Sequence, residues 1–190
     1  MNKLRFSISP ATFILLVCMI ATTPLPGLIG CFSAAVLHEF GHIAAAKLLD
    51  IDLTHMKLDI LGARLATTGR LCSYPKLITL CLAGPLVNLL CFALTLPFCQ
   101  RSEWIMEFCL SSLSLCMLNL IPIQEFDGGR IMHGVLSNFM EISTAERICS
   151  FLSFICLLCM WLFSVWLLLR TGTSLTLFVF SCCLFGMLFV

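Results

Sequence analysis

Long apolar runs separated by short polar connections dominate the pattern along the chain. Six of them are long enough, or nearly long enough, to cross a bilayer; they span about 8–23, 25–49, 77–98, 104–121, 148–169 and 173–190. No soluble domain fits into the connections between them. The pattern therefore predicts an all-α polytopic membrane protein of one domain, 1–190, with about six transmembrane helices.

The connection after the second run has a different period. In LTHMKLDILGARLATTG, Met56, Leu58 and Ile60 alternate with charged residues as in a strand, and Gly62 marks a bend. Extended backbone near a membrane must find hydrogen-bond partners, because unpaired amides are costly in hydrocarbon. We therefore predict a short membrane-associated β-hairpin over about Leu53–Leu71, with one strand edge left available.

Composition agrees with the pattern. Hydrophobic residues make up 60% of the chain and charged residues 11%, which excludes an ordinary soluble globular protein. The formal net charge of +1 gives no global attraction to nucleic acid. Most of the 13 cysteines lie within apolar runs, where cysteine packs as a small hydrophobic residue.

Basic residues predict the orientation in the membrane. Lys3 and Arg5 before a short apolar run would also suit a signal peptide, but IATTPLPG is a poor cleavage pattern, which favours an uncleaved first helix. With strict alternation of six spans, nine basic residues fall on the side of the N-terminus and two on the other. This asymmetry predicts that both termini are cytoplasmic. The nine are Lys3, Arg5, Lys47, Lys57, Arg64, Arg70, Lys76, Arg130 and Arg147, and the two are Arg101 and Arg170.

The second run contains the motif HEFGH. On a helix, His38 and His42 lie on one face and can bind one Zn²⁺, while Glu39 reaches a water on the metal. The alternative is a structural pair of histidines hydrogen-bonded within a helix bundle. That alternative still leaves Glu39 in need of a partner, since ionisable groups in membranes are costly.

A catalytic zinc site normally has three protein ligands, so one more donor is needed. His55 in the predicted hairpin and His133 in the amphipathic stretch RIMHGVLSNFM are candidates. Asp127 in NLIPIQEFDGGR is the stronger one. Pro122 ends the fourth run and Gly128–Gly129 lets the backbone turn sharply, which places Asp127 on irregular backbone at the cytoplasmic end of that span.

A third motif, AGPLVN, lies within the third run. Gly84 and Pro85 are expected to break or loosen the helix and to permit close helix approach. Asn88 puts an amide where an apolar side chain is expected. A buried asparagine in a membrane is usually a contact between helices, but this one could also reach the cavity of the predicted metal site.

Together, HEFGH, AGPLVN and N-x-x-P-x-x-x-x-D-G-G in three successive runs resemble the signature elements of the site-2 protease family of intramembrane zinc metalloproteases. The resemblance covers about Val36–Arg130. It implies that His38, His42 and Asp127 bind zinc, that Glu39 is the general base, and that Asn88 holds the substrate or the developing oxyanion. The alternating stretch resembles the family's membrane-associated β-element, which pairs with unwound substrate.

The chain also departs from the family pattern. Glu125 stands where many members carry a proline, and the β-element holds few glycines. We expect a minimal form without PDZ or CBS domain, most similar to the branch that processes a sporulation sigma-factor precursor. Its catalytic core would span about 25–130, with accessory helices at about 8–23, 148–169 and 173–190.

The expected function is hydrolysis of peptide bonds in or near transmembrane segments of membrane-bound substrate proteins. The expected partners are such a substrate and the lipid bilayer, with no nucleic acid, and the expected setting is a bacterial cell membrane. A zinc-binding scaffold or chaperone without protease activity is the alternative, but it would not need a base such as Glu39. A transporter would need polar residues in the last two runs, which hold almost none.

Overall fold

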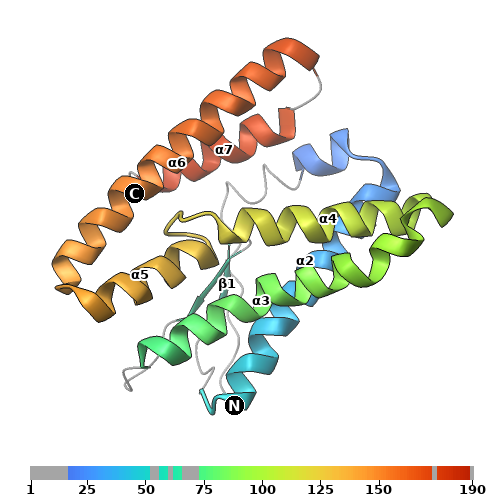
Figure 1. Cartoon of the computed structure of the whole chain (residues 1–190). Coiled ribbons are helices and arrows are strands. Elements are labelled where there is room, and N and C mark those ends of the chain that lie inside the picture. Colours follow the sequence, from blue (N-terminus) through green and yellow to red (C-terminus); the bar gives the residue numbers. More distant parts are fainter. Residues whose placement is uncertain (1–16, 52–55, 60–61, 66–72, 173–174, 189–190) are drawn as a thin grey trace.

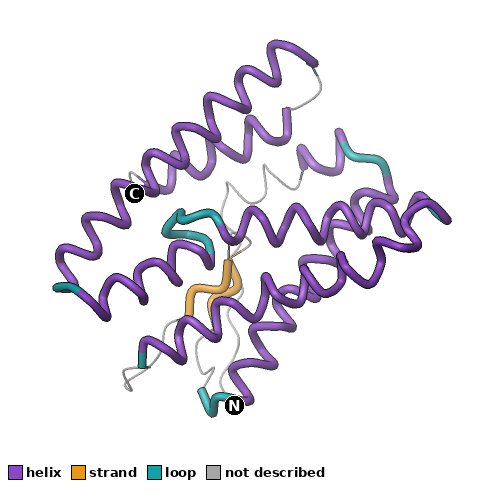
Figure 2. The backbone as a smooth tube through the Cα atoms, viewed as in Figure 1, coloured by secondary structure: helices purple, strands orange, loops and turns teal. Residues whose placement is uncertain are grey.

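The structure is a computed structural model that describes residues 17–51, 56–59, 62–65, 73–172 and 175–188. Helices make up most of it (Figures 1 and 2). Both termini, predicted to be cytoplasmic, lie outside the described residues. The elements in chain order, after a helical stretch at 17–22, are α2 (Leu25–Leu48), β1 (Met56–Asp59), β2 (Gly62–Leu65), α3 (Tyr74–Thr95), the 3₁₀ helix η1 (Leu96–Arg101), α4 (Glu103–Leu120), α5 (Asp127–Phe139), α6 (Ile142–Thr171) and α7 (Leu175–Leu188).

Helix α2 carries its small and polar residues inward and its large apolar residues outward. Phe32 and Phe40 are 72% and 65% exposed. An apolar outer face suits lipid, and small residues on the inner face let helix backbones approach closely. The buried residues are Gly27, Gly30, Ala34, His38, Gly41, His42, Ala45 and Ala46.

Helices α2, α3 and α4 pack against one another and form the centre of the molecule (Figure 1). Near the C-terminal end of α2, Ala45 and Ala46 pack against Leu80 of α3 in a small buried cluster. Helix α3 continues through Pro85 without interruption. A break of the helix at Gly84 and Pro85 is therefore wrong, and a loosening of the helix there stays a prediction.

The prediction of six transmembrane helices is also wrong. Within the described residues, three helical segments are long and apolar enough to cross a membrane: Leu25–Leu48, Tyr74–Arg101 and Ile142–Thr171. Helix α4 has 18 residues and carries Glu103 and Glu107 near its start. Helix α7 has 14 residues, or about 21 Å at 1.5 Å per residue, against a hydrocarbon core of about 30 Å. Most of the predicted first span lies outside the described residues.

Strands are a minor part of this mainly helical fold. β1 and β2 have four residues each and pair antiparallel, with Met56 opposite Leu65 and Asp59 opposite Gly62. The rest of the segment predicted as a hairpin lies outside the described residues. An association of these strands with the membrane stays a prediction.

Helices α6 and α7 form a pair that contacts the rest of the molecule mainly through α5 and the loop before it (Figure 1). Ile123 and Phe126 of this loop form a buried cluster with Leu157 of α6 and Leu184 of α7. The loop between α4 and α5 is thus held by the last two helices.

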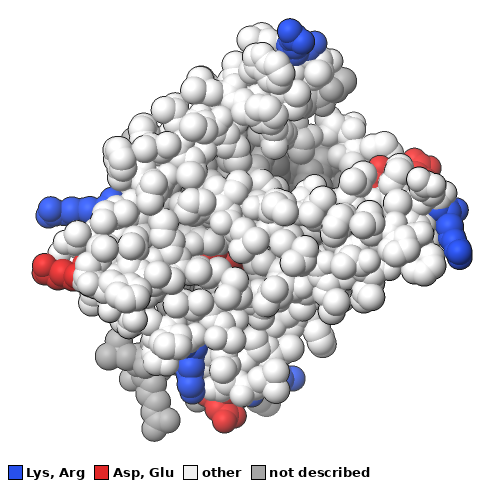
Figure 3. All heavy atoms as spheres, in the orientation of Figure 1, with Lys and Arg blue, Asp and Glu red and all other residues white. Residues whose placement is uncertain are grey.

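The outer surface is largely uncharged. Figure 3 shows Lys, Arg, Asp and Glu mostly near the periphery of the view, with a wide area of other residues between them. Large apolar side chains are exposed on several helices, among them Leu94 (63%), Phe151 (66%) and Leu169 (82%). Apolar surface on this scale, together with three helices of sufficient length, marks an integral membrane protein.

Candidate metal centre

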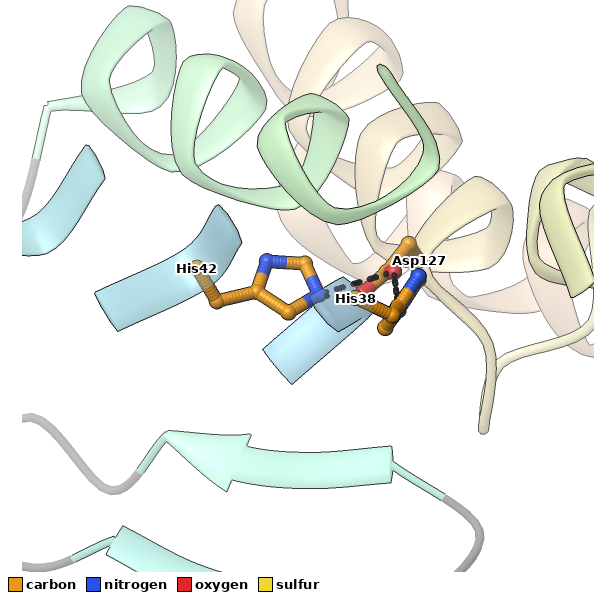
Figure 4. Close-up of side chains that lie close together, drawn as sticks. All are labelled: His38, His42 and Asp127. Atoms are coloured by element: carbon orange, nitrogen blue, oxygen red, sulfur yellow. Dashed lines mark hydrogen bonds and ion pairs between the residues drawn. The ribbon is translucent and has the colours of Figure 1, made fainter. Parts of the chain in front are cut away.

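Two histidines of α2 and the first residue of α5 meet in the interior. His38 Nε2 and His42 Nε2 lie 3.1 and 3.2 Å from Asp127 Oδ2, and the two nitrogens are 3.1 Å apart. Figure 4 shows the three side chains pointing toward one another. Each residue is at most 6% exposed. The structure thus brings together the three residues predicted as zinc ligands.

The helix period places the histidines, and packing places the carboxylate. His38 and His42 are four residues apart on α2, so their side chains share one face. Their ring centroids are 4.8 Å apart and the rings are nearly perpendicular, at 82°. This arrangement turns both Nε2 atoms toward the same point, which Asp127 reaches from a separate element.

The geometry of the three atoms fits a divalent cation. Ligands about 2.0–2.1 Å from a tetrahedral zinc lie about 3.3 Å apart, close to the separations observed here. Two imidazole nitrogens and one carboxylate oxygen are ligands that zinc takes, and they leave a fourth position open. Asp127 Oδ2 is buried and has no hydrogen-bond partner among the described residues, although it lies close to both nitrogens. A cation at the centre would satisfy this oxygen.

Asp127 begins α5, outside the three candidate spans. Burial by itself raises the pKa of this carboxyl, but its contacts with His38 and His42 outweigh burial and hold the pKa at about 2. The carboxyl is therefore ionised near neutral pH. An ionised carboxylate between two imidazoles is the form that binds a metal.

The hydrogen bond on the far side of His42 sets its tautomer. Its Nδ1 lies 2.9 Å from the carbonyl oxygen of Leu80 on α3. A carbonyl only accepts, so Nδ1 carries the hydrogen and donates it. In the neutral ring, Nε2 then presents its lone pair to the centre, which is the usual arrangement around a ligating histidine. Sequence reasoning missed Leu80, because a backbone acceptor leaves no signal in residue type.

Gly84 leaves the space in which the two imidazoles lie. A Cβ added at this position would collide with His42 Nε2 and would lie 2.7 Å from Cε1 of His38. Helix α3 therefore passes the ligands with its bare backbone. AGPLVN was predicted to permit close helix approach, but the sequence did not indicate that the ligand rings themselves fill the space.

Gly128 and Gly129, directly after Asp127, pack closely against the backbone before it. Gly128 and Gly129 lie in the first turn of α5, where a Cβ would collide with the carbonyl groups of Leu120 and Ile123. The prediction that these glycines turn the backbone sharply is wrong, since they are helical and the one described glycine with positive φ is Gly172. They are needed for close packing instead.

Helix α6 supplies a further contact to this loop. Ser153 Oγ accepts a hydrogen bond from the Gln124 backbone N–H at 2.9 Å and donates to the Pro122 carbonyl at 3.3 Å. Ser150 accepts a bond from the Gln124 side chain at 2.9 Å. Two serines three residues apart in an apolar run were a signal that sequence reasoning missed.

Comparison with known proteins identifies the architecture. The sequence matches no protein-family model and no curated protein. Among solved structures, the site-2 protease from Methanocaldococcus jannaschii is similar, with a TM-score of 0.70 and 22% sequence identity over 94% of this chain and 84% of the other. The chain has the fold of this site-2 protease. The resemblance inferred from the three motifs is thus confirmed at the level of the fold.

Within the site-2 protease fold, Glu39 follows the first histidine and is half-buried. Its Oε2 is buried without a hydrogen-bond partner among the described residues. A buried carboxylate oxygen without a partner is available to accept a hydrogen bond. Its role as the general base stays a prediction.

Asn88 lies on the side of His38 away from Asp127. Its side chain is wholly buried, and Nδ2 is 3.2 Å from His38 Nδ1, whereas Nε2 faces the centre. Its predicted role with the substrate remains untested.

The other candidate residues are not in the group of three. His133 of α5 lines a separate cavity of about 390 Å³ with Arg130 and Glu146. Glu125 is half-buried in the loop two residues before Asp127. His55 lies outside the described residues.

Proposed function

We propose that the chain is an intramembrane zinc metalloprotease that hydrolyses peptide bonds in or near transmembrane segments of membrane-bound proteins. One observation carries the proposal: His38, His42 and Asp127 converge in the interior of a membrane protein, and Glu39, which follows His38 in the sequence, has a buried oxygen without a partner. The fold shared with a site-2 protease supports the same conclusion.

In this proposal, His38, His42 and Asp127 hold the metal and leave one position open. Zinc bound there would acidify a water molecule and polarise the scissile carbonyl. Glu39 takes a proton from the attacking water through its free oxygen. As the C–N bond breaks, Glu39 passes that proton to the leaving amine, which balances the reaction.

The substrate has to be unwound before it is cut. In a transmembrane helix each carbonyl accepts a hydrogen bond from an amide four residues on, and these bonds must be replaced within the membrane. The antiparallel pair β1–β2 offers an edge on which an unwound segment can add as a strand. Helix-breaking residues near the cleavage point should therefore promote cleavage.

We also propose the organisation that the sequence suggested. The catalytic core is about 25–130, and the segments at about 8–23, 148–169 and 173–190 are accessory. The cytoplasmic orientation of the termini and of the opening of the site was predicted from six alternating spans, and we do not carry it over because that number of spans is wrong.

The test is cleavage of single-span membrane proteins, tagged at both ends and co-expressed with the chain. Glu39→Gln should retain zinc in the purified protein and lose cleavage, whereas His42→Ala should lose both. Glu103→Gln, at an exposed acid of α4, is the matched control and should cleave like wild type. Equal cleavage by wild type and Glu39→Gln would refute the proposed role of Glu39, whereas zinc binding without any cleavage by wild type would favour a scaffold that only binds zinc.

A further inference from the structure

The contact between Asn88 and His38 raises a question of hydrogen placement. The side chain of Asn88 is fully buried, at 0% exposure, and its amide lies 3.2 Å from His38 Nδ1. The amide has a nitrogen that only donates and an oxygen that only accepts. Whichever of the two faces Nδ1 therefore sets which nitrogen of His38 carries the hydrogen.

In the structure Nδ2 faces the ring, and Oδ1 is buried without a hydrogen-bond partner among the described residues. With Nδ2 donating, Nδ1 is an acceptor and the hydrogen of a neutral ring sits on Nε2. The Nε2–H group would then face Asp127 Oδ2, 3.1 Å away. It cannot bind a metal, because the ligand needs a free lone pair.

The amide can meet either requirement by rotating about its last side-chain bond. A half turn exchanges Oδ1 and Nδ2 without moving the helix, and the two orientations differ only in their hydrogen bonds. With Oδ1 facing the ring, Nδ1–H donates and Nε2 offers its lone pair. His38 then matches His42, whose Nδ1 donates to the Leu80 carbonyl.

We propose that Asn88 is the positioning residue of His38, and that its amide presents Oδ1 to Nδ1 whenever Nε2 binds the metal. This inference rests on the proposed metal centre and deepens it. It gives Asn88 a role behind the ligand, at the ring nitrogen away from the centre. The two histidines of HEFGH are then both oriented by α3, one through a side chain and one through a backbone carbonyl.

Variants at Asn88 separate this role from simple packing. Asn88→Leu keeps a similar size and removes the acceptor, so zinc affinity should fall about 10–100-fold. In Asn88→Asp the ionised carboxylate accepts hydrogen bonds and donates none, so this variant should bind zinc at least as tightly as wild type. A packing role predicts the opposite order, because Leu fits an apolar interior better than Asp does.

The measurement is a zinc titration against a competing chelator, with the purified full chain in detergent. Ser112→Ala is the matched control, since Ser112 is also 0% exposed and its hydroxyl has no hydrogen-bond partner among the described residues. It should bind zinc like wild type. Circular dichroism checks that each variant is folded, and Asn88→Ala replaces Asn88→Leu if the latter is not.

A second readout separates the hydrogen bond from the added charge of Asp. In zinc-loaded protein labelled with ¹⁵N-histidine, the His38 Nδ1–H proton should be hydrogen-bonded in wild type and Asn88→Asp, and should lose that signature in Asn88→Leu. Wild-type zinc affinity in folded Asn88→Leu would overturn the inference while leaving the metal centre intact. Zinc binding by wild type that does not depend on His42 or Asp127 would instead refute the metal centre.

Discussion

The bundle of α2, α3 and α4 and the pair of α6 and α7 are both apolar, but they are built differently. In the bundle, 28% of the residues in the most apolar stretch of each of the spans Leu25–Leu48 and Tyr74–Arg101 are buried, and these buried residues are mostly small or polar. In Ile142–Thr171 that share is 17%, although the buried residues of α6 are also mostly small or polar, and its large residues, such as Phe163 and Trp166 at 53% exposure each, also face outward. Apolar composition alone therefore does not distinguish the part that builds the site from the part that supports it.

The difference lies in what each region does for the candidate metal centre. In the bundle, the backbone of α3 lies so close to α2 that the rings of His38 and His42 take up the space that a Cβ at Gly84 would need. The α6–α7 pair touches no ligand among the described contacts and acts through the loop that carries Asp127. Substitutions in the bundle should thus change zinc affinity directly. Those in the α6–α7 pair should change the position of the loop before Asp127 or the stability of the protein.

Gly84→Ala should have the largest effect. The added methyl would collide with the ring of His42 and press on His38, so zinc affinity should fall by about 100-fold or more, at or beyond the upper end of what lost orienting contacts cost. Cleavage should fall with it. Gly186→Ala in α7 is the control, since nothing lies within 4 Å of its added Cβ, and it should bind zinc like wild type. Normal zinc binding by Gly84→Ala would mean that α3 can move away freely.

Leu157→Ala should mainly lower stability. Leu157 is 1% exposed and packs with the loop residues Ile123 and Phe126. Removing its side chain should lower the free energy of unfolding by about 2 kcal/mol, the lower end of the range for buried leucines. The loss is at the lower end because packing, rather than transfer from water, dominates in a membrane protein. Thermal unfolding in detergent measures this. Leu162→Ala, at a residue 53% exposed, should change the melting temperature little. Equal shifts in both variants would show that the cluster does not hold the last two helices.

Ser153→Ala should have a smaller effect on the metal. It leaves the Gln124 N–H without its acceptor, at a cost of about 1–3 kcal/mol, part of which the loop can relieve by shifting. We expect zinc affinity to fall by up to about tenfold. Ser164→Ala, in the same helix, removes a bond to Ser181 of α7 and should leave zinc affinity unchanged. Equal loss in both variants would show that α6 acts as a whole and not through Ser153.

Much of the local structure could be predicted from the sequence. The second apolar run was placed at about 25–49, and α2 spans Leu25–Leu48. The pairing of His38 with His42 followed from their spacing, since a helix repeats every 3.6 residues whatever surrounds it. The apolar runs predicted the wrong number of spans, because a run does not show where its helix begins and ends. Helix α4, for example, includes the two acids Glu103 and Glu107 near its start.

The sequence by itself determined the helical, membrane-embedded character of the chain, the two histidines on one helix face and the preference for Asp127 as their companion. Only the tertiary structure decided that Asp127 lies about 3 Å from both rings, that Gly84 leaves room for them and that Asn88 lies behind His38. The physical reason is range. Spacing within a helix is set by local backbone geometry, whereas the depth and rotation of one helix against another are set by many contacts between residues far apart in the chain.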